Sequence, residues 1–168
     1  MSRVYLLRHA KAATAFPGMK DFDRPLATSG LELAARLGAA MVASGLLPEI
    51  IIASPSLRTR ETLASVAANF PFEVATEFDH ALYDGDGDPY LAAIRHGGEA
   101  ASIMLVGHNP MTEEAALKLC SSGDAQAMAK LRMGFPTGGL AVIDLPGMLA
   151  EAEPKCGRLT WFITGGAI

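Results

Sequence analysis

The feature of this sequence that most constrains its fold is the alternation of short apolar runs with stretches of helical periodicity. The apolar runs cover residues 4–7, 49–53, 72–76, 102–106, 140–145 and 159–164. Helical patterns lie between them at residues 31–45, 57–69, 89–96 and 112–119, and Ser29 and Glu32 have the spacing of a capping box before the first. Continuously apolar strands are typical of a parallel sheet with helices on both faces, so the order predicts a βαβ construction.

The length of the chain limits how many such units it can hold. With 168 residues, 50% of them hydrophobic, the chain can bury one proper core and is too short for two ordinary domains. The connection at residues 146–157 is expected to close an antiparallel hairpin between the last two strands. We therefore predict one domain, residues 1–168, built as a three-layer α/β/α sandwich with a mostly parallel central sheet and an antiparallel edge.

Charge and targeting signals exclude several classes of protein. A net charge of −4 opposes a general nucleic-acid or anionic-membrane binder, which needs a basic face. The apolar run near the N-terminus ends after four residues at Arg8, too short for the core of a signal peptide. Cys120 and Cys156 are the only cysteines and lack metal-site spacing. We expect a soluble, reduced protein of the cytoplasm.

Basic side chains follow three of the buried runs, at the point where each run ends. Arg8 and His9 follow the first, Arg58 comes shortly after the second, and His108 follows the run at residues 102–106. If these strands are parallel, their carboxyl ends meet at one edge of the sheet, where open α/β folds bind ligands. Two histidines and two arginines are therefore expected to converge.

Such a set suits a phosphoryl group. Arginine offers a planar fork of donors that matches pairs of phosphate oxygens, and helix starts after residues 54 and 108 add backbone N–H groups. Like charge from the arginines is expected to lower the pKa of His9 and favour its neutral, nucleophilic form. Because the arginines and His108 would supply positive charge, we predict no metal and no cofactor.

Four motifs, taken in order, resemble those of the histidine phosphatase superfamily, whose fold is also called phosphoglycerate mutase-like. They are Leu7-Arg8-His9-Ala10, Arg24-Pro25-Leu26-Ala27-Thr28-Ser29-Gly30, Ser54-Pro55-Ser56-Leu57-Arg58-Thr59 followed by Thr62, and Val106-Gly107-His108-Asn109-Pro110. The short chain, the alanine after His9 and the Arg-Pro-Leu turn resemble the small SixA branch, the phosphohistidine phosphatases. The resemblance spans nearly the whole chain.

The resemblance implies a role for each matching position. His9 would take the phosphoryl group, Arg8 and Arg58 would bind its oxygens, and His108 would complete the pocket and stabilise the transition state. Asn109, in the same motif as His108, is a candidate for substrate binding. A further position, Arg24, would either border the pocket or anchor the turn.

The proton donor of larger family members is poorly matched. Those proteins carry a glutamate after the third strand, whereas the loop at residues 77–88 offers Asp84 as the nearest candidate. An alkoxide leaving group needs a proton, but imidazole leaves as a neutral molecule once its ring is protonated, at a pKa near ~6.5. A weak acid is therefore tolerable for phosphohistidine.

A calcium loop at residues 84–88 is disfavoured because Pro89 and Arg95 stand where an EF-hand needs glycine and glutamate.

Four functions remain open at this point. The leading one is a phosphatase for protein phosphohistidine, on a phosphotransfer domain or phosphocarrier. The second is a small-molecule phosphomonoesterase of the same superfamily. A phosphate-recognition module without turnover is disfavoured by the intact His9, and a metalloprotein using His9 and His108 is disfavoured by the neighbouring arginines, which would repel a cation.

Overall fold

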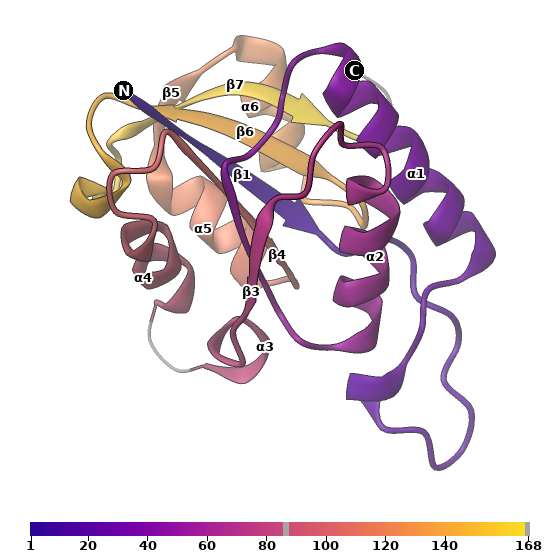
Figure 1. Ribbon diagram of the computed structural model, residues 1–168. Coiled ribbons are helices and arrows are strands. Elements are labelled where there is room, and N and C mark those ends of the chain that lie inside the picture. Colours follow the sequence, from indigo (N-terminus) through magenta and orange to yellow (C-terminus); the bar gives the residue numbers. More distant parts are fainter. Residues whose placement is uncertain (86–87, 167–168) are drawn as a thin grey trace.

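A computed structural model describes residues 1–85 and 88–166. Within these residues seven strands form one sheet in the order β3-β2-β4-β1-β6-β7-β5 (Figure 1). The strands are β1 (Ser2–Arg8), β2 (Ile50–Ala53), β3 (Ala75–Phe78), β4 (Ser102–Gly107), β5 (Cys120–Gly123), β6 (Leu140–Leu145) and β7 (Gly157–Ile163). Strands β1 to β4 pair in parallel, and β6 runs antiparallel to both β1 and β7.

Helices cover both faces of this sheet. On one face lie α1 (Thr28–Ala43) and α2 (Leu57–Ala67), and on the other α4 (Pro89–His96), α5 (Met111–Leu119) and α6 (Ala125–Arg132) (Figure 1). Shorter pieces are α3 (Ala81–Asp84) and the 3₁₀ turns η1 (Asp21–Asp23) and η2 (Leu149–Glu151). The predicted three-layer sandwich with a mostly parallel sheet is confirmed.

Alternate residues of each central strand enter different cores. In β1, Val4 and Leu6 pack into the core that includes α4 and α5, while Tyr5 and Leu7 pack into the core with α1 and α2. All six residues of β4 are buried. Burial on both faces explains why these strands read as continuous apolar runs rather than as an alternating pattern.

The register of the parallel strands fixes where their following residues lie. Arg8 pairs with Gly107, and Ala53 pairs with Val106, so β1, β2 and β4 end at one level. The backbone N–H of His9 then donates to Gly107 O at 2.9 Å, and that of Ser54 to Val106 O at 2.9 Å. The residues after the three strands are thereby held at one edge of the sheet.

Several elements differ from the sequence-based expectations. The antiparallel β6–β7 pair is present, but the edge strand beyond it is β5, which was not predicted and which is followed by the equally unexpected α6. Strand β3 begins at Ala75, three residues later than expected. The capping box at Ser29 is absent, because α1 begins at Thr28 after Ala27 and has no side-chain cap.

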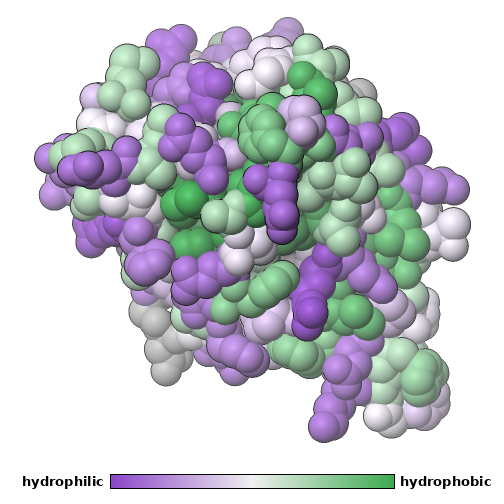
Figure 2. Space-filling view, in the orientation of Figure 1, coloured by the Kyte–Doolittle hydropathy of each residue, from purple (hydrophilic) through white to green (hydrophobic). Residues whose placement is uncertain are grey.

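The loop expected at residues 77–88 contains the end of β3 and the short helix α3. Residues 86 and 87 of the acidic run considered as a calcium loop lie outside the described residues. Hydrophilic and hydrophobic side chains are interspersed on the face shown in Figure 2. In the described ranges no helix has both the length and the apolar character needed to span a bilayer.

Candidate active site

His9 lies directly after β1 and is 7% exposed. Its ring nitrogen Nδ1 is 2.7 Å from the carbonyl oxygen of Ala10. A carbonyl oxygen can only accept a hydrogen bond, so Nδ1 carries the hydrogen and donates it. In the neutral ring this leaves Nε2 unprotonated, with a lone pair that is available for attack on an electrophile.

The electrostatic surroundings keep this ring neutral. Burial is the largest cause that lowers the pKa of His9, and the charges of Arg58, Arg8 and Arg24 lower it further. The hydrogen bond to Ala10 acts in the opposite direction, and the resulting pKa is about 4. The lowered pKa agrees with the expectation from the sequence, but desolvation contributes more to it than the like charge of the arginines.

The second histidine lies beside the first. The ring centroids of His9 and His108 are 5.2 Å apart. Nδ1 of His108 is 3.3 Å from Nη2 of Arg58, which can only donate, so Nδ1 is the acceptor. Nε2 of His108 therefore carries the hydrogen and donates to Oγ of Ser54 at 2.8 Å.

His108 does not supply the positive charge expected of it. Burial, followed by the charge of Arg58, lowers the pKa of His108 to about 3, so the ring is neutral near pH 7. Its backbone N–H donates to Oη of Tyr90 at 3.0 Å, which fixes the backbone that carries the ring. Arginine side chains therefore provide the fixed positive charge of the site, and a phosphate dianion beside His108 would raise its pKa again.

Three arginines surround the histidine pair. Arg58 lies in the first turn of α2 and is 5% exposed, and Arg8 ends β1 and donates from Nη1 to Phe135 O at 2.8 Å. Arg24 follows η1, close enough for its charge to lower the pKa of His9. The buried Nε atoms of all three have no hydrogen-bond partner among the described residues. Donors left in this way around a neutral histidine are suited to the oxygens of an anion.

Asp21 belongs to the site and was missed by the sequence analysis. Arg58 donates from Nη1 to the backbone oxygen of Asp21 at 2.6 Å and from Nη2 to its carboxylate Oδ2 at 2.9 Å. Arg24 lies 3.7 Å from the other carboxylate oxygen, and Oη of Tyr83 donates to Oδ2 at 3.2 Å. The available signal was an acidic residue three positions before the arginine of the Arg-Pro-Leu turn.

Asn109 contacts the same carbonyl oxygen as Arg8 of this cluster, whereas Asp84 is exposed outside it. Asn109 donates from Nδ2 to Phe135 O at 3.1 Å, the same oxygen that Arg8 contacts, and its buried Oδ1 has no partner in the described part of the chain. A cavity of about 680 Å³ borders the site through Arg8 and Asn109. The side chain of Asp84 is exposed at the end of α3, and none of the hydrogen bonds found in residues 1–85 and 88–166 joins its carboxylate to His9 or the arginines.

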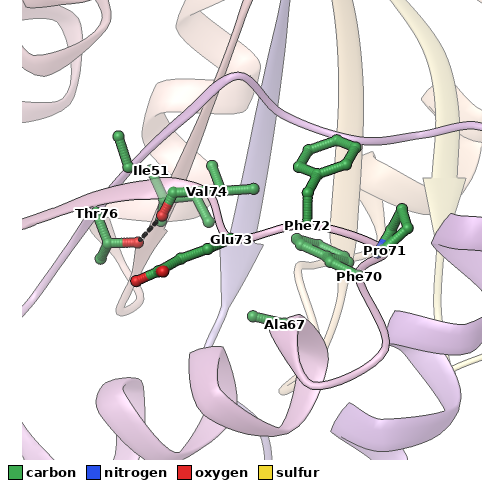
Figure 3. A pocket seen from close by; sticks show the side chains of 9 residues that line it. Ile51, Ala67, Phe70, Pro71, Phe72, Glu73, Val74 and Thr76 are labelled. Atoms are coloured by element: carbon green, nitrogen blue, oxygen red, sulfur yellow. Dashed lines mark hydrogen bonds between the residues drawn. The ribbon is translucent and has the colours of Figure 1, made fainter.

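Candidate metal sites and a second cavity were also considered as functional sites. Groups of three histidine, cysteine or acidic side chains able to hold a metal ion are not found in the described ranges. A cavity of about 730 Å³, shown in Figure 3, lies at the start of β2 and β3, the opposite edge of the sheet from His9. Its lining is mostly apolar, and Glu73 is its single ionisable residue.

Comparisons with known proteins identify the family to which this geometry belongs. Residues 4–86 match the model of the histidine phosphatase superfamily, branch 1. The crystal structure of a candidate phosphohistidine phosphatase SixA from Agrobacterium tumefaciens is 34% identical, covers 97% of each chain and superposes with a TM-score of 0.83. An uncharacterised protein of Mycobacterium tuberculosis is 34% identical over 93% of this chain and 98% of its own.

A more distant relative carries an assigned activity. The protein of Escherichia coli named phosphohistidine phosphatase SixA is 28% identical over 85% of each chain. The matched family model, the shared fold and the cluster of His9, His108 and arginines agree with one another. This chain is a phosphatase of the histidine phosphatase superfamily and belongs to its SixA-type branch.

Proposed function

We propose that this phosphatase removes the phosphoryl group from phosphohistidine on a protein, through a covalent intermediate on His9. The observation that carries the proposal is the hydrogen bond from Nδ1 of His9 to the carbonyl of Ala10. It directs the lone pair of the neutral ring to Nε2, and the low pKa of about 4 keeps that lone pair free near neutral pH.

Two displacements account for turnover. In the first, Nε2 of His9 forms a bond to phosphorus while the bond from phosphorus to the substrate nitrogen breaks and leaves its electron pair on that nitrogen. In the second, water attacks phosphorus, the bond to Nε2 breaks, and inorganic phosphate leaves. The donors of Arg8, Arg58 and Arg24 hold the three equatorial oxygens, whose charge is spread in a loose transition state.

The carboxylates of the site support phosphohistidine over an alkyl phosphate as substrate. An alkoxide needs a proton donor, but Asp84 is exposed on α3. Partial burial raises the pKa of Asp21, while the hydrogen bond and charge of Arg58 outweigh that effect and leave the pKa lowered. Asp21 is therefore an anion near pH 7 and a poor acid. A phosphohistidine ring needs no acid from the enzyme if its second nitrogen is already protonated.

The substrate that we propose is a phosphorylated protein, such as a phosphotransfer domain or a phosphocarrier. Two observations support it. The Escherichia coli relative is named for activity on phosphohistidine. The side chain of Asp21, which borders the arginines, is 56% exposed, so a ring carried on the surface of another protein can reach the rim of the site.

Replacement of His9 by alanine tests the mechanism. We expect His9→Ala to abolish turnover of a phosphohistidine protein, because the nucleophile is removed. Acid-labile, base-stable ³²P label should accumulate on the wild-type protein and be absent from the variant. His96→Ala is the matched control, since His96 is exposed on α4 and its ring lies 3.5 Å from the carboxylate of Glu77. A label on serine, cysteine or aspartate would overturn the covalent-histidine mechanism.

A further inference from the structure

Asp21 has a position that the two displacements above do not use. Its carboxylate lies against Arg58 at 2.9 Å and receives a hydrogen bond from Tyr83 at 3.2 Å, yet it remains 56% exposed. The side chain of Arg58, by contrast, is 7% exposed. Arg58 and Tyr83 thus hold Oδ2 of Asp21 and Arg24 lies 3.7 Å from Oδ1, while more than half of the side chain remains open to solvent.

In-line displacement determines which part of a substrate meets this carboxylate. The leaving group lies on the side of phosphorus opposite the attacking nitrogen. His9 is at the buried floor of the site, so the leaving group must lie toward solvent. Asp21 lies on that solvent side, next to an arginine that holds the phosphoryl oxygens. In this arrangement the leaving ring of a bound substrate would lie on the same side of phosphorus as the Asp21 carboxylate.

The aromatic side chains of Tyr83 and Phe22 lie close to the Asp21 carboxylate, on the exposed side of the site. The ring of Tyr83 packs edge-on against His108 with centroids 5.5 Å apart and edge-on against Phe22 at 5.2 Å. Phe22 in turn stacks on His80, with 6.1 Å between centroids. Aromatic faces beside a carboxylate attract a flat cation, through the ring quadrupole and through charge.

We propose that Asp21 determines specificity for phosphohistidine by accepting a hydrogen bond from the second, protonated ring nitrogen of the substrate, with Tyr83 and Phe22 packing beside that ring. The inference rests on the proposed function and names the residue that recognises its leaving group. Asp21 would touch the substrate itself, in addition to its contact with Arg58.

The chemistry of the leaving group explains what this contact would do. A phosphohistidine ring whose second nitrogen is protonated carries a positive charge. When the bond to phosphorus breaks, the electron pair stays on the ring, the proton stays on the second nitrogen, and neutral imidazole leaves. The Asp21 carboxylate favours the protonated ring, so it strengthens binding of the reactive form and keeps it protonated to higher pH.

A phosphate ester gains nothing from the same carboxylate. It has no ring N–H to donate, and the negative charge that develops on its leaving oxygen is repelled by an adjacent anion. Asp21 should therefore raise the preference of the enzyme for phosphohistidine over an ester. This consequence separates the proposal from a role in which Asp21 only holds Arg58 in place, because that role would affect both substrates equally.

The test is Asp21→Asn, assayed on a phosphohistidine-containing phosphocarrier protein and on p-nitrophenyl phosphate. The amide oxygen can still accept from Arg58, so the variant removes the charge and largely keeps the phosphoryl pocket. We expect kcat/KM on phosphohistidine to fall about 10-fold or more, as for a lost hydrogen bond to a charged group. The alkaline limb of its pH profile should move to lower pH. Activity on p-nitrophenyl phosphate should fall less, so that the preference for phosphohistidine over the ester decreases.

Asp23→Asn serves as the matched control, since Asp23 lies on the same 3₁₀ turn and is exposed. Equal losses of the Asp21 variant on both substrates would overturn the inference and assign Asp21 to positioning Arg58. Unchanged activity on both would overturn it as well. A wild-type enzyme that hydrolyses p-nitrophenyl phosphate and leaves phosphohistidine untouched would instead refute the proposed function, and the inference with it.

Discussion

At the scale of single residues, hydrogen-bond partners assign different tautomers to two histidines that look alike in the sequence. His9 faces a carbonyl, which forces its hydrogen onto Nδ1 and leaves Nε2 free. His108 faces a guanidinium, which forces the hydrogen onto Nε2, where Ser54 accepts it. One ring is therefore prepared to act as a nucleophile, and the other supports the arginine beside it.

Asp84 provides a test of the leaving-group argument at this scale. Because its carboxylate is exposed at the end of α3 and imidazole can leave without an acid, Asp84→Asn should lower the rate on phosphohistidine by less than ~10-fold, or about 1.4 kcal/mol. The measurement is kcat on a phosphohistidine protein, with an alkyl phosphate assayed in parallel. A loss of ~10²–10⁴-fold on phosphohistidine, typical of a missing general acid, would contradict the argument.

At the scale of elements, the site depends on how closely helix α4 approaches the end of strand β4. Oη of Tyr90, on α4, accepts from the backbone of His108 and pairs with Oγ1 of Thr112 at 3.1 Å. Tyr90 can reach these partners because Gly107 has no side chain, and a Cβ at that position would overlap its hydroxyl. A glycine of the fourth motif thus allows a helix to position the second histidine.

Substitution at Gly107 should show this dependence. Gly107→Ala would force Tyr90 away from the strand, and we expect a loss of about 1–3 kcal/mol in the free energy of unfolding, as for other overpacked sites. Urea titration measures the loss. Combining it with Tyr90→Phe removes the hydroxyl that is nearest the new methyl group, so the double variant should be more stable than the sum of the single effects predicts. Strictly additive losses would show that this contact is not the cause.

At the scale of the whole molecule, folding places two neutral histidines at a buried sheet edge among arginines, and this links stability to pH. The pKa of His9 falls from 6.5 to about 4 and that of His108 to about 3 on folding. Below pH 6.5 the unfolded chain takes up protons that the folded chain excludes. The stability that these histidines contribute is therefore complete above pH 6.5 and is lost as the pH falls toward 4 and 3.

The size of this loss can be measured by urea unfolding. Between about pH 7 and about pH 5, each histidine should reduce the free energy of unfolding by on the order of 2 kcal/mol. His9→Asn should remove its share of the pH dependence, because asparagine does not titrate. A pH dependence that is identical in the variant and the wild type would contradict the low pKa of His9.

Much of the fold and the main cluster could be predicted from the sequence because both depend on local patterns. Continuous apolar runs indicate strands that are buried on both faces, and these runs correctly predicted β1, β2, β4, β6 and β7. The basic residues after three of these runs then had to meet wherever the strands ran parallel. Arg8, His9, Arg58 and His108 are brought together for that reason.

Strand β5 was not predicted and the start of β3 was placed three residues too early, because neither strand carries such a pattern. Strands β3 and β5 are at the two edges of the sheet, all four residues of β3 are exposed, and the middle two of β5 are exposed as well. Because the side chains of these edge strands face solvent, they need not be apolar. The sequence therefore has no apolar run that marks where either strand begins and ends.

The tertiary structure alone decided the chemistry of the rim and the state of the histidines. Asp21 and Arg58 are separated by 37 residues, and their contact depends on the path of a loop that carries no periodic signal. The tautomers of His9 and His108 depend on which single atom lies nearest each ring nitrogen. Apolar periodicity specifies which residues are buried and at which edge they emerge. Only packing in three dimensions specifies donor and acceptor distances, on which proton positions depend.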